Sequence, residues 1–239
     1  SPNPSRRAFA RREGFGEVLA DGVERAARQI GKGAEEYAIH VQGEEVPMHD
    51  PRLNPGLATS YQIDATPGRH TQMGTWTVEA GYSPEGLVTE KIEREKATGK
   101  GRAHRIVSGH QHAAASAGMC MMAWVALKPE ALTDSLTYTT GYRYTLDEVL
   151  EIGDRIAALR MAFNIREGVR NVDFALPGRM IGSPPLSSGP LAGVTVDVQT
   201  QLREYLEVMG WDTRTGAPLE ETLRKLGLDF VAAELYPGE

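Results

Sequence analysis

The chain has 239 residues, of which 41% are hydrophobic and 24% charged, so it holds enough apolar side chains to bury a substantial core. Its net charge of -6 argues against a nucleic-acid partner, because binding to phosphates needs an excess of basic side chains. The longest apolar run, residues 113–127, is interrupted by Ser116 and is shorter than the roughly 20 residues that cross a bilayer. We therefore expect a folded, soluble protein without a membrane segment.

Cysteine usage limits the covalent and metal chemistry of this chain. A single cysteine, Cys120, excludes an internal disulfide and any metal site built from several thiolates of this chain alone. The chain begins with Ser1, and residues 1–12 are rich in arginine without the apolar stretch of a secretory signal. This start favours a linker or a cut end over a transit peptide.

The first part of the chain predicts a helix, a strand and a loop, in that order. Apolar residues recur at three- and four-residue spacing from Phe15 to Ile30, as in an amphipathic helix, and Gly31 follows where such a helix would end. Residues 37–43 alternate with a period of two, which predicts a short strand. The prolines in residues 44–55 then predict a loop, so we place a domain boundary near residue 43.

The middle of the chain alternates irregular and apolar segments. Residues 67–86 mix glycine, proline and aromatic residues and predict a packed loop, whereas the charged residues 90–105 predict a solvated surface. Residues 113–127 are apolar on all sides, as in a helix that is buried among other helices. We expect this segment to lie near the centre of the fold.

The last part of the chain has the most regular helical pattern. Thr145 and Glu148 form a capping box, and apolar residues then repeat at three and four residues as far as Phe163. Residues 177–190 are rich in proline, glycine and serine and predict an irregular connection. Two further apolar stripes end at Gly210 and Gly227. The sequence thus predicts a mainly α, multihelical fold with long irregular loops and few strands.

Several side chains are candidates for chemistry, and each also has a structural explanation. Cys120 is by default a small buried hydrophobe with an inert thiol. His110 and His112 lack the neighbours of a metal site, which favours surface or helix-start positions. His70 follows a glycine-bearing turn that suits proton transfer, although the residue alone favours a structural or exposed histidine. The carboxylates of residues 147–154 avoid the apolar stripe and predict a solvated helix face.

Short motifs spread over nearly the whole chain occur in an order that is typical of one family. In chain order they occupy residues 14–22, 40–43, 49–52, 66–70, 118–120, 152–156, 163–168, 176–179, 210–212 and 226–228. Each motif is weak alone. In this order they resemble the C-terminal region of the aldehyde ferredoxin oxidoreductase family, whose members are tungsten-pterin enzymes.

The resemblance implies an oxidoreductase and its cofactors. An aldehyde would be oxidised to a carboxylic acid at a tungsten held by two pterins, with molybdenum as the alternative metal for this molybdopterin-type cofactor. Electron transfer would run through a 4Fe-4S cluster to ferredoxin. The resemblance also implies a cytoplasmic location and allows a homodimer. Residues 1–43 would end a middle helical domain, and residues 44–239 would form the C-terminal helical domain.

The resemblance also implies roles for individual residues. Cys120 matches the fourth cluster ligand of the family, and a thiolate is what an iron–sulfur cluster requires. His70 matches the active-site histidine, with proton transfer or hydrogen bonding to the substrate near the metal as its expected role. Gly118 and Met119 are expected to pass close to a pterin, where a small residue permits close approach of the backbone.

Two departures from the family pattern limit what is carried over. Ala115 stands where the family commonly has an aspartate that contacts a pterin, so that carboxylate is missing. The three upstream cluster cysteines and the pterin-gripping domain are also absent, so we expect this chain alone to bind no cofactor and to need a missing N-terminal portion or subunit. The same departures motivate an alternative, a non-catalytic helical interaction or scaffold module derived from the family.

Overall fold

The computed structural model describes residues 4–238, and most of its regular elements are helices. Within these residues it contains thirteen α-helices, two 3₁₀ helices and one two-stranded sheet. The mainly α, multihelical class predicted from the sequence is therefore confirmed. None of the helices in the described part of the chain is long and apolar enough to span a membrane.

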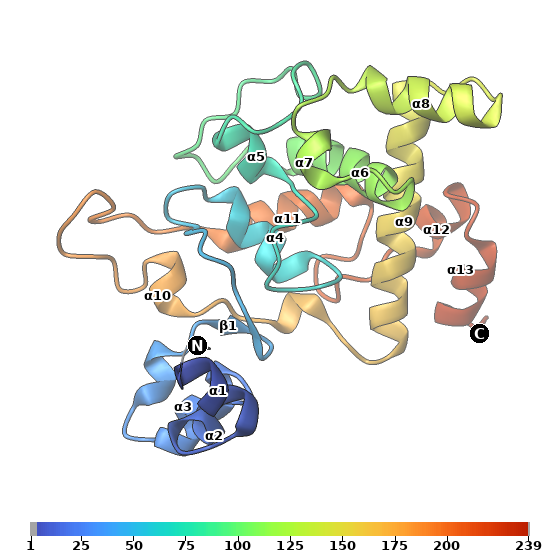
Figure 1. Cartoon of the computed structure of the whole chain (residues 1–239). Coiled ribbons are helices and arrows are strands. Elements are labelled where there is room, and N and C mark those ends of the chain that lie inside the picture. Colours follow the sequence, from blue (N-terminus) through green and yellow to red (C-terminus); the bar gives the residue numbers. More distant parts are fainter. Residues whose placement is uncertain (1–3, 239) are drawn as a thin grey trace.

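The N-terminal helices form a group at one end of the molecule (Figure 1). They are α1 Pro4–Arg11, α2 Phe15–Leu19, α3 Val23–Ile30 and the 3₁₀ helix η1 Ala34–Tyr37. The single helix expected over residues 15–30 is interrupted, because Gly22 adopts a φ of 87° and separates α2 from α3. The expected linker at the start of the chain is helical from Pro4 onwards.

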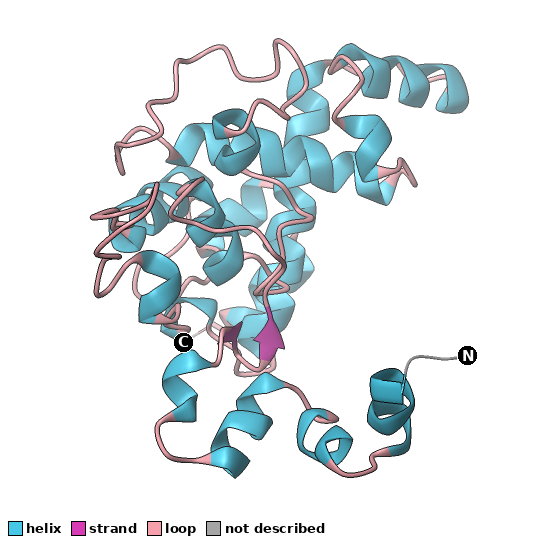
Figure 2. Cartoon of the chain, turned by 60° about the vertical axis from the view of Figure 1, so that its left-hand side comes forward, coloured by secondary structure: helices cyan, strands magenta, loops and turns pink. Residues whose placement is uncertain are grey.

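A short antiparallel hairpin follows these helices. Strand β1 His40–Val41 pairs with β2 Glu44–Glu45, and His40 lies opposite Glu45. Gln42 and Gly43 form the turn with positive φ values, as two-residue hairpin turns require. Figures 1 and 2 both show the hairpin between the N-terminal helices and the rest of the chain. The domain boundary near residue 43 stays a prediction.

Five helices build the centre of the remaining chain. They are α4 Gly56–Ile63, α5 Thr75–Glu79, α6 Gly101–Ser116, α9 Leu146–Arg166 and α11 Val198–Met209. Helices α6 and α9 approach closely at two glycines, since a Cβ on Gly153 would overlap the carbonyl of Gly109. Helix α9 begins at the predicted capping box, where the Glu148 N–H donates to the Thr145 hydroxyl at 3.3 Å and the Thr145 N–H donates to the Glu148 carboxylate at 2.8 Å.

Two clusters of buried side chains hold these helices together. The first includes Trp76 and Trp124, and the second includes Met161 and Leu206. Shorter helices complete the described chain: α7 Met121–Trp124, α8 Glu130–Thr140, η2 Asn171–Asp173, α10 Gly178–Ile181, α12 Glu220–Lys225 and α13 Asp229–Leu235. The connection predicted to be irregular thus contains one short helix, α10, which begins directly after Pro177.

Candidate functional site

Cys120 lies in a sharp break between α6 and α7. Helix α6 ends in a Schellman motif, in which the Gly118 N–H donates to the Ala115 carbonyl at 3.0 Å and the Met119 N–H donates to the Ala114 carbonyl at 2.9 Å. Gly118 has a φ of 82°, which glycine adopts at little steric cost. The backbone then becomes extended at Cys120, whose thiol is free and exposed.

This break overturns the expectation of one buried helix over residues 113–127. An apolar run predicts burial on all sides only while the backbone stays helical, and Gly118 redirects the backbone in the middle of the run. Met122, for example, is 67% exposed. The exposed members of residues 115–123 form a largely apolar patch around the thiol, which we call the Cys120 surface.

Helix α7 is anchored to α6 beneath the Cys120 surface. Trp124 is 1% exposed, and its Nε1 donates to Nδ1 of His110 at 2.7 Å. Burial lowers the pKa of His110, which keeps its ring neutral at pH 7. His110 and His112 are both buried, so the expectation of surface or helix-start histidines is wrong, because this side of α6 faces the core. The Trp124 anchor fixes the turn of helix that directly follows Cys120.

His70 lies on the turn before α5 and contacts a second histidine. The ring centroids of His49 and His70 are 4.6 Å apart, and the Trp76 ring lies 5.8 Å from the first and 5.9 Å from the second. Burial, and then the neighbouring His49, lowers the pKa of His70, so its imidazole is neutral and able to accept a proton at pH 7. The Trp76 indole N–H is buried without a hydrogen-bond partner among residues 4–238.

His49 has no role assigned from the sequence, although it lies in the motif of residues 49–52. His49 and His70 flank the wholly buried helix α4, and they meet only because the chain turns back on both sides of it. Tyr61 in α4 holds the segment that carries His49, because its hydroxyl donates to the His49 carbonyl at 3.1 Å. Two histidines on either side of one short helix are the feature of the sequence that points to such a pair.

A cleft of about 900 Å³ opens beside His49. Residues 46–52 line one side and residues 178–187 line the other. Arg52 donates from Nε and Nη2 to the carboxylate of Asp50 at 3.0 and 2.7 Å. Burial alone would raise the pKa of this carboxyl group, but the hydrogen bonds from Arg52 outweigh burial and lower it, so the pair stays ionised. The cleft therefore has a fixed charged edge and reaches His49, whose ring contacts that of His70.

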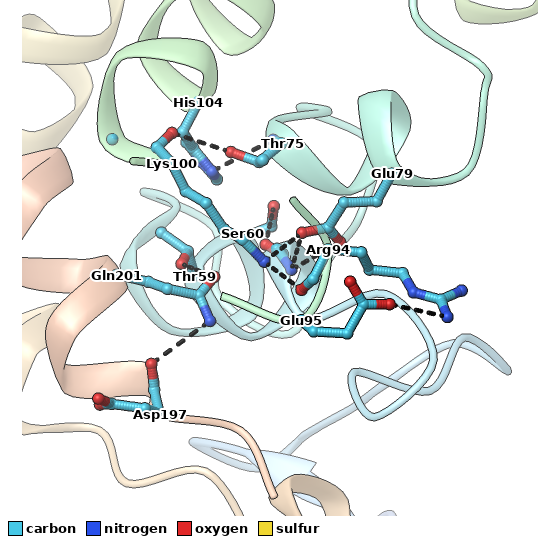
Figure 3. A network of polar contacts seen from close by, with 12 residues as sticks. Thr59, Ser60, Thr75, Glu79, Arg94, Glu95, Lys100, His104, Asp197 and Gln201 are labelled. Carbon is cyan, nitrogen blue, oxygen red and sulfur yellow. Dashed lines mark hydrogen bonds and ion pairs between the residues drawn. The ribbon is translucent and has the colours of Figure 1, made fainter. Parts of the chain in front are cut away.

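A buried ion pair supports helix α5, which carries Trp76. Lys100 Nζ donates to the Glu79 carboxylate at 2.6 Å and to the Arg94 carbonyl at 2.8 Å (Figure 3). The two charged side chains are 2% and 0% exposed. Glu79 also accepts a hydrogen bond from the Gly56 N–H at 2.9 Å and so connects α5 to the start of α4. The prediction that residues 90–105 form a solvated surface is wrong at Lys100, because a charged side chain can be buried once it is paired.

The described residues do not bring together the ligands of a metal site. Among residues 4–238, no three or more His, Cys, Asp or Glu side chains are grouped as a metal site would need. Cys120 offers one exposed thiol, the kind of side chain that an iron–sulfur cluster takes as a ligand. No other part of the described chain lies within 4 Å of a Cβ added at Gly118, so the backbone there is open to a bound group, although its φ alone accounts for the glycine.

Comparison with known proteins places these features in one family. A family model described as aldehyde ferredoxin oxidoreductase, domains 2 and 3, matches residues 6–228. The tungsten-containing aldehyde ferredoxin oxidoreductase of Pyrococcus horikoshii is 30% identical, over 92% of this chain and 35% of its own length. That of Pyrococcus furiosus is 29% identical, over 95% and 36%. An aliphatic sulfonate oxidoreductase, WOR-like subunit, of Pyrococcus furiosus is 29% identical over 94% of this chain and 34% of its own length.

One solved structure shares the fold of nearly the whole chain. It is the active site complex BamBC of benzoyl coenzyme A reductase in complex with 1,5-dienoyl-CoA, with a TM-score of 0.66 and 21% identity, covering 97% of this chain and 39% of the matched chain. The chain spans 34–36% of the curated relatives named above. From the match of the family model over residues 6–228, we conclude that the chain belongs to the aldehyde ferredoxin oxidoreductase family and corresponds to a C-terminal region of its longer members.

Proposed function

We propose that this chain is the C-terminal part of an enzyme that oxidises aldehydes to carboxylic acids. Such an enzyme would use a tungsten-bis-pterin, a 4Fe-4S cluster and ferredoxin as electron acceptor. The names of the Pyrococcus relatives support the metal and the reaction. The observation that carries the proposal is the exposed thiol of Cys120, held on a fixed break between two helices and surrounded by an apolar surface.

His70 would act as the proton acceptor. Oxidation of an aldehyde to a carboxylic acid consumes one water and releases two electrons and two protons, and the bound tungsten cofactor would supply the two-electron oxidation. A ring nitrogen of His70 can accept one of these protons, because the imidazole is neutral at pH 7. His49 lines the cleft and its ring contacts that of His70, so the cleft would bring a substrate to the neighbour of the proposed proton acceptor.

Cys120 would contribute a thiolate to the cluster, and the remaining protein would contribute the other three ligands. Gly118 and Met119 would form the pterin-facing backbone next to it. Met119 packs against the same buried cluster that contains Trp76 and Trp124. The segment that carries the cluster ligand and the segment that contacts His70 therefore rest on one core, which suits two sites that must keep a fixed separation.

The proposed role of His70 is tested in the complete enzyme with ferredoxin and an aldehyde. We expect His70→Gln to lower kcat by about 10²- to 10⁴-fold, the usual contribution of a general acid or base. The matched control is His40→Gln, because His40 lies on the hairpin and not in the group of rings formed by His49, His70 and Trp76. Full activity of His70→Gln would contradict the assignment. Full function of both His70→Gln and Cys120→Ser in the native setting would instead favour the non-catalytic scaffold module.

A further inference from the structure

The turn that carries His70 is held by one arginine of helix α9. Arg160 Nη2 donates a hydrogen bond to the Thr66 hydroxyl at 2.8 Å, and Nη1 donates to the side-chain carbonyl of Gln72. In the chain, Thr66 precedes His70 and Gln72 follows it. A single planar guanidinium group therefore joins the two ends of the turn, and its fork of N–H donors suits two acceptors at once.

The same face of α9 also holds the beginning of this segment. Asn164 lies one helical turn after Arg160, and its Nδ2 donates to the Ala65 carbonyl at 2.8 Å. The Asp64 carboxyl group is 5% exposed and lies 3.8 Å from Nη1 of Arg160. Burial raises its pKa to about 7, and the charge of Arg160 opposes this rise. These contacts restrict Arg160 to one orientation, although its side chain remains 34% exposed at the rim.

A small cavity borders the guanidinium group beneath the turn. It measures about 20 Å³, room for roughly one water molecule, and Asp64, His112, Arg160 and Trp211 are among the residues that line it. Burial lowers the pKa of His112 to about 3, so this histidine is neutral at pH 7. The Trp211 indole N–H is buried without a hydrogen-bond partner among residues 4–238. Truncation of Arg160 would enlarge a polar cavity that opens toward solvent.

We propose that Arg160 is a positioning residue that holds His70 against His49. This inference rests on the catalytic role proposed above for His70. Arg160 acts through the turn, because its hydrogen bonds reach Thr66 and Gln72 and not the imidazole itself. A lysine keeps the positive charge but offers one nitrogen, so it cannot reproduce the two-ended bridge.

Histidine NMR of this chain tests the inference without cofactors. Loosening the turn exposes the imidazole to water, so Arg160→Ala and Arg160→Lys should both shift the His70 ring signals and raise its pKa toward the ordinary value. Millimolar guanidinium should restore the wild-type signals in Arg160→Ala by occupying the enlarged cavity, and it should not restore them in Arg160→Lys. Arg166→Ala is the matched control, because Arg166 lies on the same helix but contacts exposed side chains, through ion pairs with Glu167 and Glu234 and a cation–π contact with Phe163.

The complete enzyme provides a second measurement. A misplaced proton acceptor should lower kcat on the order of 10²-fold in Arg160→Ala, with a much smaller change in KM. Unchanged His70 signals in either Arg160 variant would overturn the inference, as would a folded Arg160→Ala variant that guanidinium does not rescue. If Arg160→Ala does not fold, the His70 ring signals of Arg160→Lys decide whether Arg160 positions His70. An inactive wild-type enzyme would refute the proposed function, and the NMR result would still decide the role of Arg160.

Discussion

At the scale of single residues, the contact between His49 and His70 affects how readily His70 accepts a proton. Their rings touch, so protonation of one disfavours protonation of the other. Burial adds to this effect at His70. Burial and the neighbouring ring therefore both favour the neutral form of His70, which can accept a proton from another group.

The coupling within this pair gives a direct prediction. We expect His49→Gln to raise the pKa of His70, because the substitution removes the neighbouring positive charge, while the burial that remains keeps the pKa below its usual value. Proton NMR titration of the histidine Cε1–H signals in this chain measures the shift. A His70 pKa that stays constant or falls in this variant would contradict the coupling.

Three buried groups predict how stability depends on pH. Burial lowers the pKa of His104 and of His112 to about 3, so between about pH 6.5 and 3 the unfolded chain binds more protons than the folded one. Because of these two histidines, the free energy of unfolding decreases as the pH is lowered through this range. Asp64 acts in the opposite direction, because burial raises its pKa to about 7 and the folded chain binds the extra proton below that pH. The two histidines change the difference in bound protons by more than the one carboxyl group does. The free energy of unfolding should therefore fall as the pH is lowered from 6.5 to 4.

Urea unfolding at pH 4, 5, 6 and 7 measures this dependence. His112→Asn should flatten the loss of stability by up to about 1.4 kcal/mol per pH unit, the limit for one proton, whereas Asp64→Asn should make the loss steeper. The two variants thus change the slope in opposite directions. Parallel stability curves for the wild type and both variants would show that these groups do not titrate differently in the folded and unfolded chains.

At the scale of elements, the crossing of α6 and α9 depends more on Gly153 than on Gly109. An added Cβ at Gly153 would overlap the backbone of Gly109, whereas an added Cβ at Gly109 would meet Asp154 Oδ1 at 3.6 Å, an ordinary contact. Gly153→Ala should therefore cost about 3 kcal/mol through overpacking, and Gly109→Ala should change stability by less than about 1 kcal/mol. Chemical unfolding of both variants tests this asymmetry, and equal losses would contradict it.

Helices with local signals were predictable from the sequence, and helices that depend on backbone reversals were not. Helix α9 was predicted because its capping box and its apolar spacing are both local. The break at Gly118 was missed because the apolar pattern continues through it, and a glycine within an apolar run does not reveal a left-handed conformation. The carboxylates of α9 were predicted to be solvated, yet Asp154 is buried, because Arg105 of α6 donates to it at 2.9 Å from Nε.

At the scale of the whole molecule, the incomplete donor set and the exposed apolar patch have a common explanation. The chain spans 35% of its Pyrococcus horikoshii relative, and the Cys120 surface is where we expect the remaining part of such a protein to bind. The assignments of Cys120 and His70 come from family motifs and stay predictions. His49 also lies in such a motif, residues 49–52, but its contact with His70, like the contact of Arg160 with Thr66, arises only across the fold.

The central claim is that Cys120 is a ligand of a cluster completed by the rest of the protein, and iron per chain measures it most directly. The complete enzyme should be purified without oxygen as wild type, as Cys120→Ser and as the neighbouring control Ser116→Ala. We predict about four irons per chain in the wild type and the control, as for a four-cysteine cluster, and a clear loss of iron in Cys120→Ser. Since the thiol is exposed, Cys120→Ser in this chain without cofactors should keep its folding stability within about 0.5 kcal/mol. A full complement of iron in Cys120→Ser would contradict the claim.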